Sequence, residues 1–224
     1  MPTVLITGAN RGLGLEFARQ YARDGWSVIA TAREPGSADD LRAIDGVQVE
    51  ALDAGDLDTV VRFGEPLGEA PLDVFIANAG TYGPRQIETA ADGEGWLDAL
   101  KVMAVSPVLM ARALMPNLAQ ARGKAVAITS RMGSIADNDS GGFIAYRSAK
   151  ATVNAAWTSL AIDGRDDPVA FALLHPGWVQ TRMGGANAPV TPHDSIAGMR
   201  AVIAGLRPTG RAPFLDFQGQ TVPW

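Results

Sequence analysis

Short apolar segments rich in β-branched residues alternate with longer amphipathic segments along the 224 residues of the chain. Continuous apolar runs of this kind are typical of parallel strands that are buried on both faces of a sheet. The runs predict strands over residues 3–7, 27–31, 47–51, 73–77, 124–129 and 169–174, with a further edge strand over 212–217. The segments between them predict helices near 13–24, 57–67, 94–120, 145–163 and 191–206.

The regular alternation of strand and helix predicts the fold class. Successive right-handed crossovers place such strands in one parallel sheet that is covered by helices on both faces. No linker, repeat or low-complexity segment divides the chain. We therefore expect a single α/β domain over residues 1–224, built on a doubly wound, Rossmann-like sheet.

Composition narrows the classes of function. The net charge of −5 and the scattered arginines disfavour binding to nucleic acid. The chain has no cysteine and two histidines, which excludes thiol chemistry and disulfides and predicts no metal site. No apolar run is long enough to span a bilayer and no signal peptide is evident, so we expect a cytoplasmic protein without a membrane partner.

A glycine-rich stretch, TGANRGLG, follows the first predicted strand. Gly8, Gly12 and Gly14 lie where that strand turns into a helix, and glycine allows both a sharp turn and a close approach of the backbone to a ligand. The main-chain N–H groups of the helix N-terminus would face an anion such as a dinucleotide pyrophosphate. The spacing is G-x3-G-x-G rather than G-x-G-x-x-G, so a plain tight turn is the alternative.

The second predicted strand is followed by a residue that bears on the choice of cofactor. Arg33 lies in the window that meets the adenosine ribose in dinucleotide folds, and Arg11 lies within the glycine turn. Two guanidinium groups suit a 2′-phosphate, whereas the neighbouring Glu34 would suit unphosphorylated NAD. We favour NADP (NADPH), with NAD as the alternative.

The stretch AYRSAK places Tyr146 four residues before Lys150, one of only three lysines in the chain. Residues four apart on a helix share a face, so the ammonium would lie near the phenol. A nearby positive charge favours the phenolate, and we expect Lys150 to lower the pKa of Tyr146 into the range of a general acid–base. For an isolated Tyr-x-x-x-Lys, an ordinary helix turn is the alternative.

Five motifs in this order give the chain a resemblance to a known family. TGANRGLG, NAG (78–80), TSRMGS (129–134), AYRSAK and HPGWVQT (175–181) together resemble the short-chain dehydrogenase/reductase family. The C-terminal segment resembles its compact C-factor-like, carbonyl-reductase-like branch. The resemblance implies an NADP-dependent oxidoreductase that transfers a hydride between the nicotinamide and a carbonyl compound or secondary alcohol.

The resemblance also implies a role for individual residues. Ser130, Tyr146 and Lys150 would be catalytic: Tyr146 exchanges the proton, Ser130 binds the substrate oxygen, and Lys150 also holds the nicotinamide ribose. Thr129 is the nearest rival to Ser130. The cofactor would be bound by Gly8, Asn10, Arg11, Gly12, Leu13, Gly14, Arg33, Asp53, Asn78, Ala79, Gly80, Tyr146, Lys150, Pro176, Gly177, Val179 and Thr181. Alternatively, Asp53 and Asn78 only cap turns or helices, and Pro176–Gly177 is only a loop.

One position departs from the family pattern. Many members have an asparagine in the middle helix that completes a proton relay from the lysine, and Met103 stands in the matching stretch KVMAVSP. Ser106, a backbone carbonyl or slow turnover are the alternatives that would account for this. A nucleotide-sensing or signalling protein with little turnover is therefore a second hypothesis for the function.

The segment around the motifs bears on the substrate and on assembly. Residues 136–142 predict a flexible lip over the site, and Met132, Phe143, Trp178 and Met183 predict an apolar carbonyl pocket. Arg131 and Arg147 either recognise a carboxylate or are simply exposed. The alanine-rich stretches 104–121 and 149–163 suit packing between copies, so we expect a homodimer or homotetramer.

Overall fold

Seven parallel strands form the centre of the computed structural model, which describes residues 1–224. The strands are β1 (Thr3–Ile6), β2 (Ser27–Ala32), β3 (Val47–Ala51), β4 (Val74–Ala77), β5 (Lys124–Ile128), β6 (Ala170–His175) and β7 (Phe214–Asp216). Their order across the sheet is β3-β2-β1-β4-β5-β6-β7, and every neighbouring pair is parallel. All seven predicted strands are confirmed, including the edge strand.

The order of the strands fixes where a ligand can bind. The chain builds outward from β1 through β2 to β3, then returns to the other side of β1 and continues from β4 to β7. The reversal leaves a crevice at the carboxyl ends of β1 and β4, because the connections from these two strands leave in opposite directions. Leu5 in β1 pairs with Ile29 on one side and Phe75 on the other, so the centre of the sheet is apolar.

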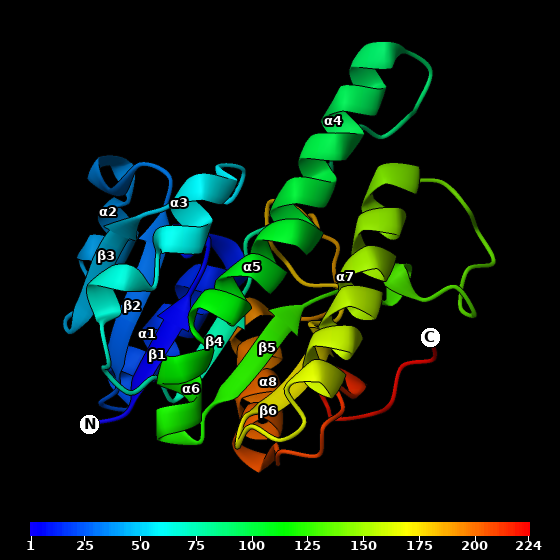
Figure 1. Cartoon of the computed structure of the whole chain (residues 1–224). Helices are drawn as coiled ribbons and strands as arrows, with labels where there is room; N and C mark the ends of the chain where they lie inside the picture. Colours follow the sequence, from blue (N-terminus) through cyan, green and yellow to red (C-terminus); the bar gives the residue numbers. More distant parts are fainter.

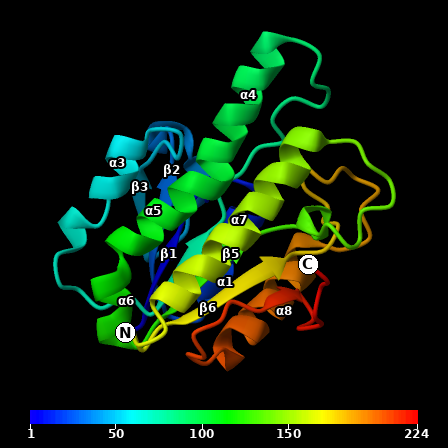
Figure 2. The same cartoon turned by 45° about the vertical axis from the view of Figure 1, so that its right-hand side comes forward.

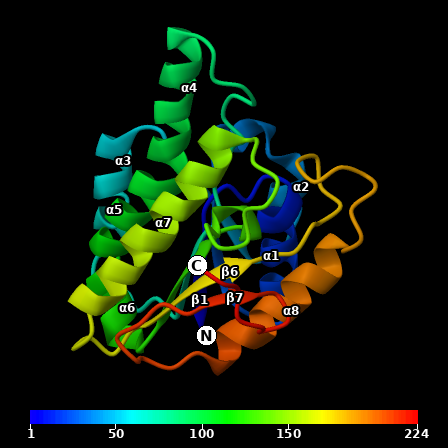
Figure 3. The ribbon, with the colours of Figure 1, turned by 90° about the vertical axis from the view of Figure 1, so that its right-hand side faces the viewer.

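Helices cover both faces of the sheet, as predicted (Figure 1, Figure 3). Buried side chains of α1 (Gly12–Arg23), α2 (Asp39–Arg42) and α8 (Pro192–Gly205) form the core on one face. Those of α3 (Leu57–Arg62), α5 (Ser106–Ala113), α6 (Met115–Ala121) and α7 (Ile144–Asp163) form the core on the other. The fold is a doubly wound α/β fold.

The predicted helix over 94–120 is wrong in its extent. It begins earlier, as α4 (Ala90–Leu100), where Thr89 and Asp92 form a reciprocal N-terminal capping box. A π-helical turn over Lys101–Val105 separates α4 from α5, and α6 starts anew at Met115. Pro107 lies just after the π turn, and a proline cannot donate the main-chain bond that a regular helix requires there. The short α2 was not predicted at all.

Helices α4 and α7 pack side by side and extend beyond the carboxyl edge of the sheet (Figure 1, Figure 2). They thereby form one wall of the region above the strand ends. No single helix is long and apolar enough to cross a membrane. Only the pair Ala90–Ala113 and Met115–Ala121, taken together, has the length and composition of a membrane span, and the two helices are bent by 59° relative to one another.

Candidate active site

The carboxyl ends of β1, β4 and β5 bring three of the predicted motifs together. The glycine turn follows β1, Asn78 follows β4, and Ser130 follows β5 by two residues. Helix α7 packs directly against the turn after Ser130, because a Cβ atom on Gly133 would lie 2.8 Å from the Cβ of Lys150. Only a glycine allows this contact, which sets Lys150 and Ser130 at the same strand end.

The glycine turn has no room for side chains. Gly8 has a φ of +64°, and a Cβ atom there would lie 2.9 Å from the Cα of Ala79. On Gly14 it would lie 2.5 Å from the carbonyl oxygen of Gly8 and 2.6 Å from the Nδ2 of Asn78. Gly12, with a φ of +56°, faces the Cγ2 of Thr181 at 3.7 Å. The backbone conformation and the close packing therefore both require glycine, and the turn lies beside segments from residues 78–80 and 175–181.

Two predicted cofactor residues build turns in this structure. The Asn78 side chain donates hydrogen bonds to the carbonyl oxygens of Thr7 and Gly8, at 2.9 and 3.1 Å, and so ties β4 to the glycine turn. The Asp53 carboxylate accepts a bond from the main-chain N–H of Gly55 at 2.8 Å. Both side chains therefore stabilise turns, as the alternative interpretation of Asp53 and Asn78 expects. A direct role for either side chain in binding the cofactor stays a prediction.

The start of α1 fits an anionic group. The helix begins at Gly12 without a side-chain cap and without an acidic residue in its first turn. Its first N–H groups therefore lack side-chain partners, and the helix dipole favours negative charge there. Arg11 beside this turn and Arg33 directly after β2 are both exposed, and neither is in an ion pair. The tight glycine cradle and the two free guanidinium groups fit a phosphorylated dinucleotide. Asn10 and Leu13 belong to the same turn, with Asn10 exposed and Leu13 half-buried.

The segment after β6 crosses over the glycine turn. Gly177 has a φ of +84°, and a Cβ atom there would lie 3.1 Å from the Phe217 ring. The carbonyl oxygen of Pro176 accepts a bond from the hydroxyl of Ser195 in α8 at 2.6 Å. Val179 is buried and bridges to Val190. The conformation of this segment is thus fixed by packing against α8 and β7.

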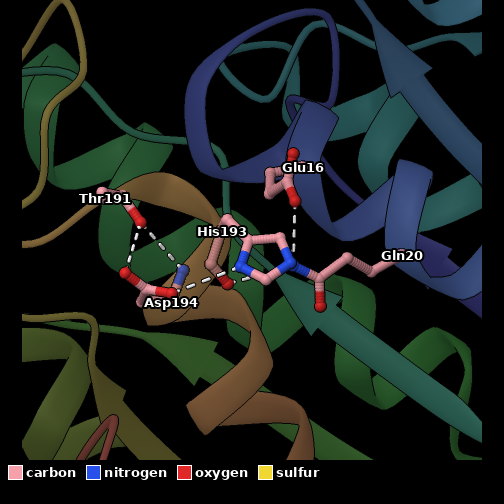
Figure 4. A network of polar contacts seen from close by, with 5 residues as sticks. All are labelled: Glu16, Gln20, Thr191, His193 and Asp194. Atoms are coloured by element: carbon pink, nitrogen blue, oxygen red, sulfur yellow. Dashed lines mark hydrogen bonds and ion pairs between the residues drawn. The ribbon is translucent and has the colours of Figure 1, made fainter.

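A polar network joins α8 to α1 beneath that segment (Figure 4). The amide of Gln20 donates to the Glu16 carboxylate at 2.8 Å and to the main-chain oxygen of His193 at 3.1 Å. Thr191 caps α8 by accepting from the N–H of Asp194 at 3.1 Å. These bonds hold the start of α8, and with it the segment 176–190, against the helix that begins at the glycine turn.

Tyr146 and Lys150 lie on the same face of α7, as their spacing predicts. The Nζ of Lys150 is 5.8 Å from the centre of the Tyr146 ring, and both side chains are buried. Ser130 is close enough to the phenol to lower its pKa through a hydrogen bond, and its hydroxyl oxygen also accepts from the main-chain N–H of Met132 at 3.1 Å. Thr129, the rival to Ser130, is turned away, because its hydroxyl donates to the Asn154 side chain at 2.7 Å within the core.

The expected effect of Lys150 on Tyr146 is wrong for this structure. Burial raises the pKa of Tyr146 to about 12, and what opposes the rise is the hydrogen bond with Ser130. Lys150 donates its own hydrogen bond to the carbonyl oxygen of Ile128 at 2.7 Å, and burial lowers the pKa of its ammonium to about 8. Loss of hydration outweighs the neighbouring cation, so Tyr146 is a protonated acid near neutral pH.

Met103 fills apolar space beside Tyr146. It is 1% exposed in the π-helical turn and packs in a small cluster with Ala99, Tyr146 and Ala149. Its Sδ would lie 3.7 Å from a Cβ atom on Gly80. Lys150 donates its hydrogen bond to the carbonyl oxygen of Ile128 in β5, and a part for Ser106 in the relay stays a prediction.

Tyr82, which no motif in the sequence indicates, contacts Phe143 and Met183, two of the residues predicted to line the pocket. Its ring centre is 5.1 Å from that of Tyr146 and 5.9 Å from that of Phe143. Its hydroxyl donates to the carbonyl oxygen of Met183 at 2.9 Å. Met132 packs on the same cluster. The only sequence signal for Tyr82 is its position two residues after the NAG motif.

The predicted arginines serve the lip rather than a substrate carboxylate. Arg147 donates to the carbonyl oxygen of Gly141 at 3.0 Å and to the Ser140 hydroxyl at 2.9 Å. Arg131 lies 3.7 Å from the Asp137 carboxylate. Both guanidinium groups therefore contact the segment 136–142, with Arg131 exposed and Arg147 half-buried.

Known proteins are similar to this chain in sequence and in fold. The profile of the short chain dehydrogenase family matches residues 2–190. The chain is 43% identical to the protein named C-signal of Myxococcus xanthus over 155 residues, which are 69% of this chain and 93% of that protein.

Solved structures cover the whole chain. The carbonyl reductase Sniffer of D. melanogaster has a TM-score of 0.91 with this chain, at 28% identity and with 100% of both chains covered. A carbonyl reductase from Pseudomonas aeruginosa PAO1 in complex with NADP has a TM-score of 0.84 at 34% identity, again with 100% of both chains covered. The glycine turn, the strand-end serine and the tyrosine–lysine pair thus occur in a chain whose sequence and fold match one family throughout. The chain belongs to the short-chain dehydrogenase/reductase family and is an NAD(P)-dependent oxidoreductase.

Proposed function

We propose that this protein reduces apolar carbonyl compounds with NADPH, and that Tyr146 donates the proton to the carbonyl oxygen. The observation that carries the proposal is the convergence of Ser130, Tyr146 and Lys150 at one strand end beside the glycine turn. The carbonyl-reductase names of the solved relatives support the same reaction class.

The cofactor would lie along the carboxyl edge of the sheet. The turn from Gly8 to Gly14 would hold the pyrophosphate, and Arg11 with Arg33 would bind a 2′-phosphate. NADPH supplies a hydride to the carbonyl carbon when it is bound there. The NADP found in the Pseudomonas aeruginosa relative supports the phosphorylated form. Pro176, Gly177, Val179 and Thr181 would lie along the nicotinamide.

The buried phenol suits the direction of reduction. A group whose pKa is raised to about 12 stays protonated at neutral pH and can give its proton to a developing alkoxide. The hydroxyl of Ser130 would stabilise that oxygen by a hydrogen bond. The cation of Lys150, 5.8 Å from the ring centre, would stabilise the phenolate that remains.

The site favours apolar substrates. Phe143 and Trp178 are 37% and 58% exposed, Met132 packs against the cluster that contains Tyr146, and the Met183 carbonyl oxygen is bonded to Tyr82. The two arginines nearest to the catalytic residues are held by the segment 136–142. We therefore propose uncharged ketones and aldehydes rather than oxo acids. A cytoplasmic location and assembly into a homodimer or homotetramer stay predictions.

A signalling protein with little turnover is the second candidate. Two observations favour it: the 43% identity to the protein named C-signal, and Met103 in place of the family asparagine. The intact Ser130, Tyr146 and Lys150 favour the enzyme.

A substrate panel distinguishes the two candidates. We expect steady oxidation of NADPH, faster than of NADH, with uncharged ketones or aldehydes, and little with oxo acids. Tight binding of NADPH without turnover on any carbonyl compound of the panel would favour the signalling protein.

A further inference from the structure

Tyr82 joins three segments that surround the catalytic tyrosine. It follows β4, its ring lies 5.1 Å from that of Tyr146 on α7, and its hydroxyl bonds to Met183 in the segment after β6. The ring also lies 5.9 Å from Phe143, at the start of α7. The Tyr82 side chain thus connects α7 with the segment after β6.

The backbone around Tyr82 is fixed on both sides. Gly83, with a φ of +63°, would place a Cβ atom 3.0 Å from the Cβ of Ala99 and 3.3 Å from that of Ala145. The chain therefore lies directly against α4 and α7, where no larger residue fits. This contact sets the position from which the Tyr82 ring extends over Tyr146.

The segment that receives the Tyr82 hydroxyl is ordered by its own bonds. The indole of Trp178 donates to the carbonyl oxygen of Gly184 at 2.7 Å, and the N–H of Gly184 donates to the Thr181 hydroxyl at 3.1 Å. The Met183 carbonyl is thus part of a compact turn, and the bond at 2.9 Å ties the whole turn to Tyr82.

The groups that face the Tyr146 phenol are few. Ser130, Lys150 and Tyr82 are the polar groups beside it, and Arg147 is turned toward residues 140 and 141. Tyr146 is 9% exposed, and burial is the main cause of its raised pKa. Among these three neighbours of the phenol, Ser130 and Lys150 are proposed to be catalytic, whereas Tyr82 has no role assigned so far.

We propose that Tyr82 is a positioning and specificity-determining residue, whose ring shields Tyr146 and whose hydroxyl holds the 178–184 turn as a wall for carbonyl compounds with an aromatic substituent. An aromatic substituent would stack on the half-buried Tyr82 ring and on the Phe143 ring, which is 37% exposed and has the Arg85 guanidinium 6.0 Å from its centre. The substrate part of this inference rests on the reductase function proposed above, whereas the shielding part does not.

The shielding can be measured in the protein without cofactor or substrate. The chain has three tyrosines, so the double variants Tyr21→Phe/Tyr82→Phe and Tyr21→Phe/Tyr82→Ala each leave Tyr146 as the only phenol. Tyr21 lies in α1 and is common to both variants. Ultraviolet titration should give a pKa for Tyr146 that is at least about one unit lower with alanine at 82 than with phenylalanine, because water then reaches the phenol. Equal pKa values in two folded variants would overturn the shielding.

Kinetics test the wall. Tyr82→Phe keeps the ring and loses one hydrogen bond, so KM for an aryl ketone should rise roughly fivefold with little change in kcat. Tyr82→Ala should raise that KM by about tenfold or more, yet change KM for a small aliphatic aldehyde much less. Tyr21→Phe, a hydroxyl deletion outside the site, is the control and should match the wild type. Equal KM values for the aryl ketone in all three variants would show that the 178–184 turn held by Tyr82 does not contact the substrate.

The two measurements separate this inference from the reductase proposal. If no carbonyl compound is turned over by the wild-type protein, the reductase proposal and the substrate wall fail together. The titration then still decides whether Tyr82 shields Tyr146. If the wild type is active and neither measurement responds to Tyr82, the reductase proposal stands and this inference is wrong.

Discussion

The ammonium of Lys150 lies 5.8 Å from the centre of the Tyr146 ring and is hydrogen-bonded to the end of β5 through the carbonyl oxygen of Ile128 at 2.7 Å. The same cation therefore fixes α7 to the sheet and lies beside the Tyr146 phenol. Burial of both groups keeps the phenol protonated and makes the lysine easier to deprotonate.

Replacing Gly14 tests the glycine turn. Gly14→Ala would place a Cβ atom 2.5 Å from the Gly8 carbonyl oxygen, and the turn must shift. We expect a loss of about 1–3 kcal/mol in the free energy of unfolding, with NADPH binding strongly weakened. Gly93→Ala, in α4 with no neighbour within 4 Å, is the matched control and should stabilise the protein by about 0.5–1 kcal/mol. Denaturant unfolding and a binding titration measure both, and an unchanged affinity in Gly14→Ala would contradict the turn's role.

Replacing Arg33 tests the preference for the phosphorylated cofactor. Its exposed guanidinium directly follows β2 and forms no ion pair, so it is available for a 2′-phosphate. Arg33→Ala should weaken NADPH about tenfold or more, as expected for lost charged hydrogen bonds, and leave NADH nearly unchanged. The exposed Arg19 on α1 provides the control variant Arg19→Ala. Equal losses for both nucleotides in Arg33→Ala would refute this assignment.

Met103 provides a test of the proton relay. Met103→Asn would put an amide into an apolar cluster beside Tyr146, with an expected loss of about 1–3 kcal/mol in stability and no gain in turnover. Met103→Leu keeps the volume and should cost less than about 1.5 kcal/mol. A higher kcat in Met103→Asn would show instead that the missing amide limits the reaction.

The burial of His175 should make the folding stability of the protein sensitive to acid. Burial, with a smaller contribution from Arg131, lowers its pKa from 6.5 to about 4, and its Nδ1 has no hydrogen-bond partner. The unfolded chain therefore binds more protons between these values, so stability is lost as the pH falls from 6.5 toward 4.

The measurement compares unfolding free energies at pH 7 and pH 5. In His175→Phe, the difference between the two pH values should be smaller than in the wild type by about 2 kcal/mol. His193 has a side chain that is 61% exposed, and His193→Gln should keep the wild-type difference. An unaltered difference in His175→Phe would show that other groups account for the acid sensitivity.

Some features of the fold and the site could be predicted from the sequence because they depend on local patterns of residues. The strands alternate with helices in a simple order, and Gly8 and Gly12 of the first turn have positive φ angles that favour glycine. The spacing of Tyr146 and Lys150 sufficed to place them on one helix face.

Other features depend on contacts between distant segments. Tyr82 meets Met183 across 101 residues of sequence, and no pattern near either residue indicates it. The π-helical turn before Pro107 arises where α4 and α5 pack on α7. The direction of the Tyr146 pKa follows from how deeply the phenol is buried, which spacing on a helix does not reveal.

The central claim is that the Tyr146 hydroxyl supplies the proton in the reaction. Tyr146→Phe keeps the ring, its packing on Tyr82 and the adjacent cation, and removes only the hydroxyl. With a carbonyl compound that the wild type reduces, turnover should fall by at least about a thousandfold, within the range of general acid–base catalysis. The Kd for NADPH should stay within about twofold of the wild type, a difference well below 1 kcal/mol. Wild-type turnover in Tyr146→Phe, on a substrate that the unaltered protein reduces, would contradict this account of the site.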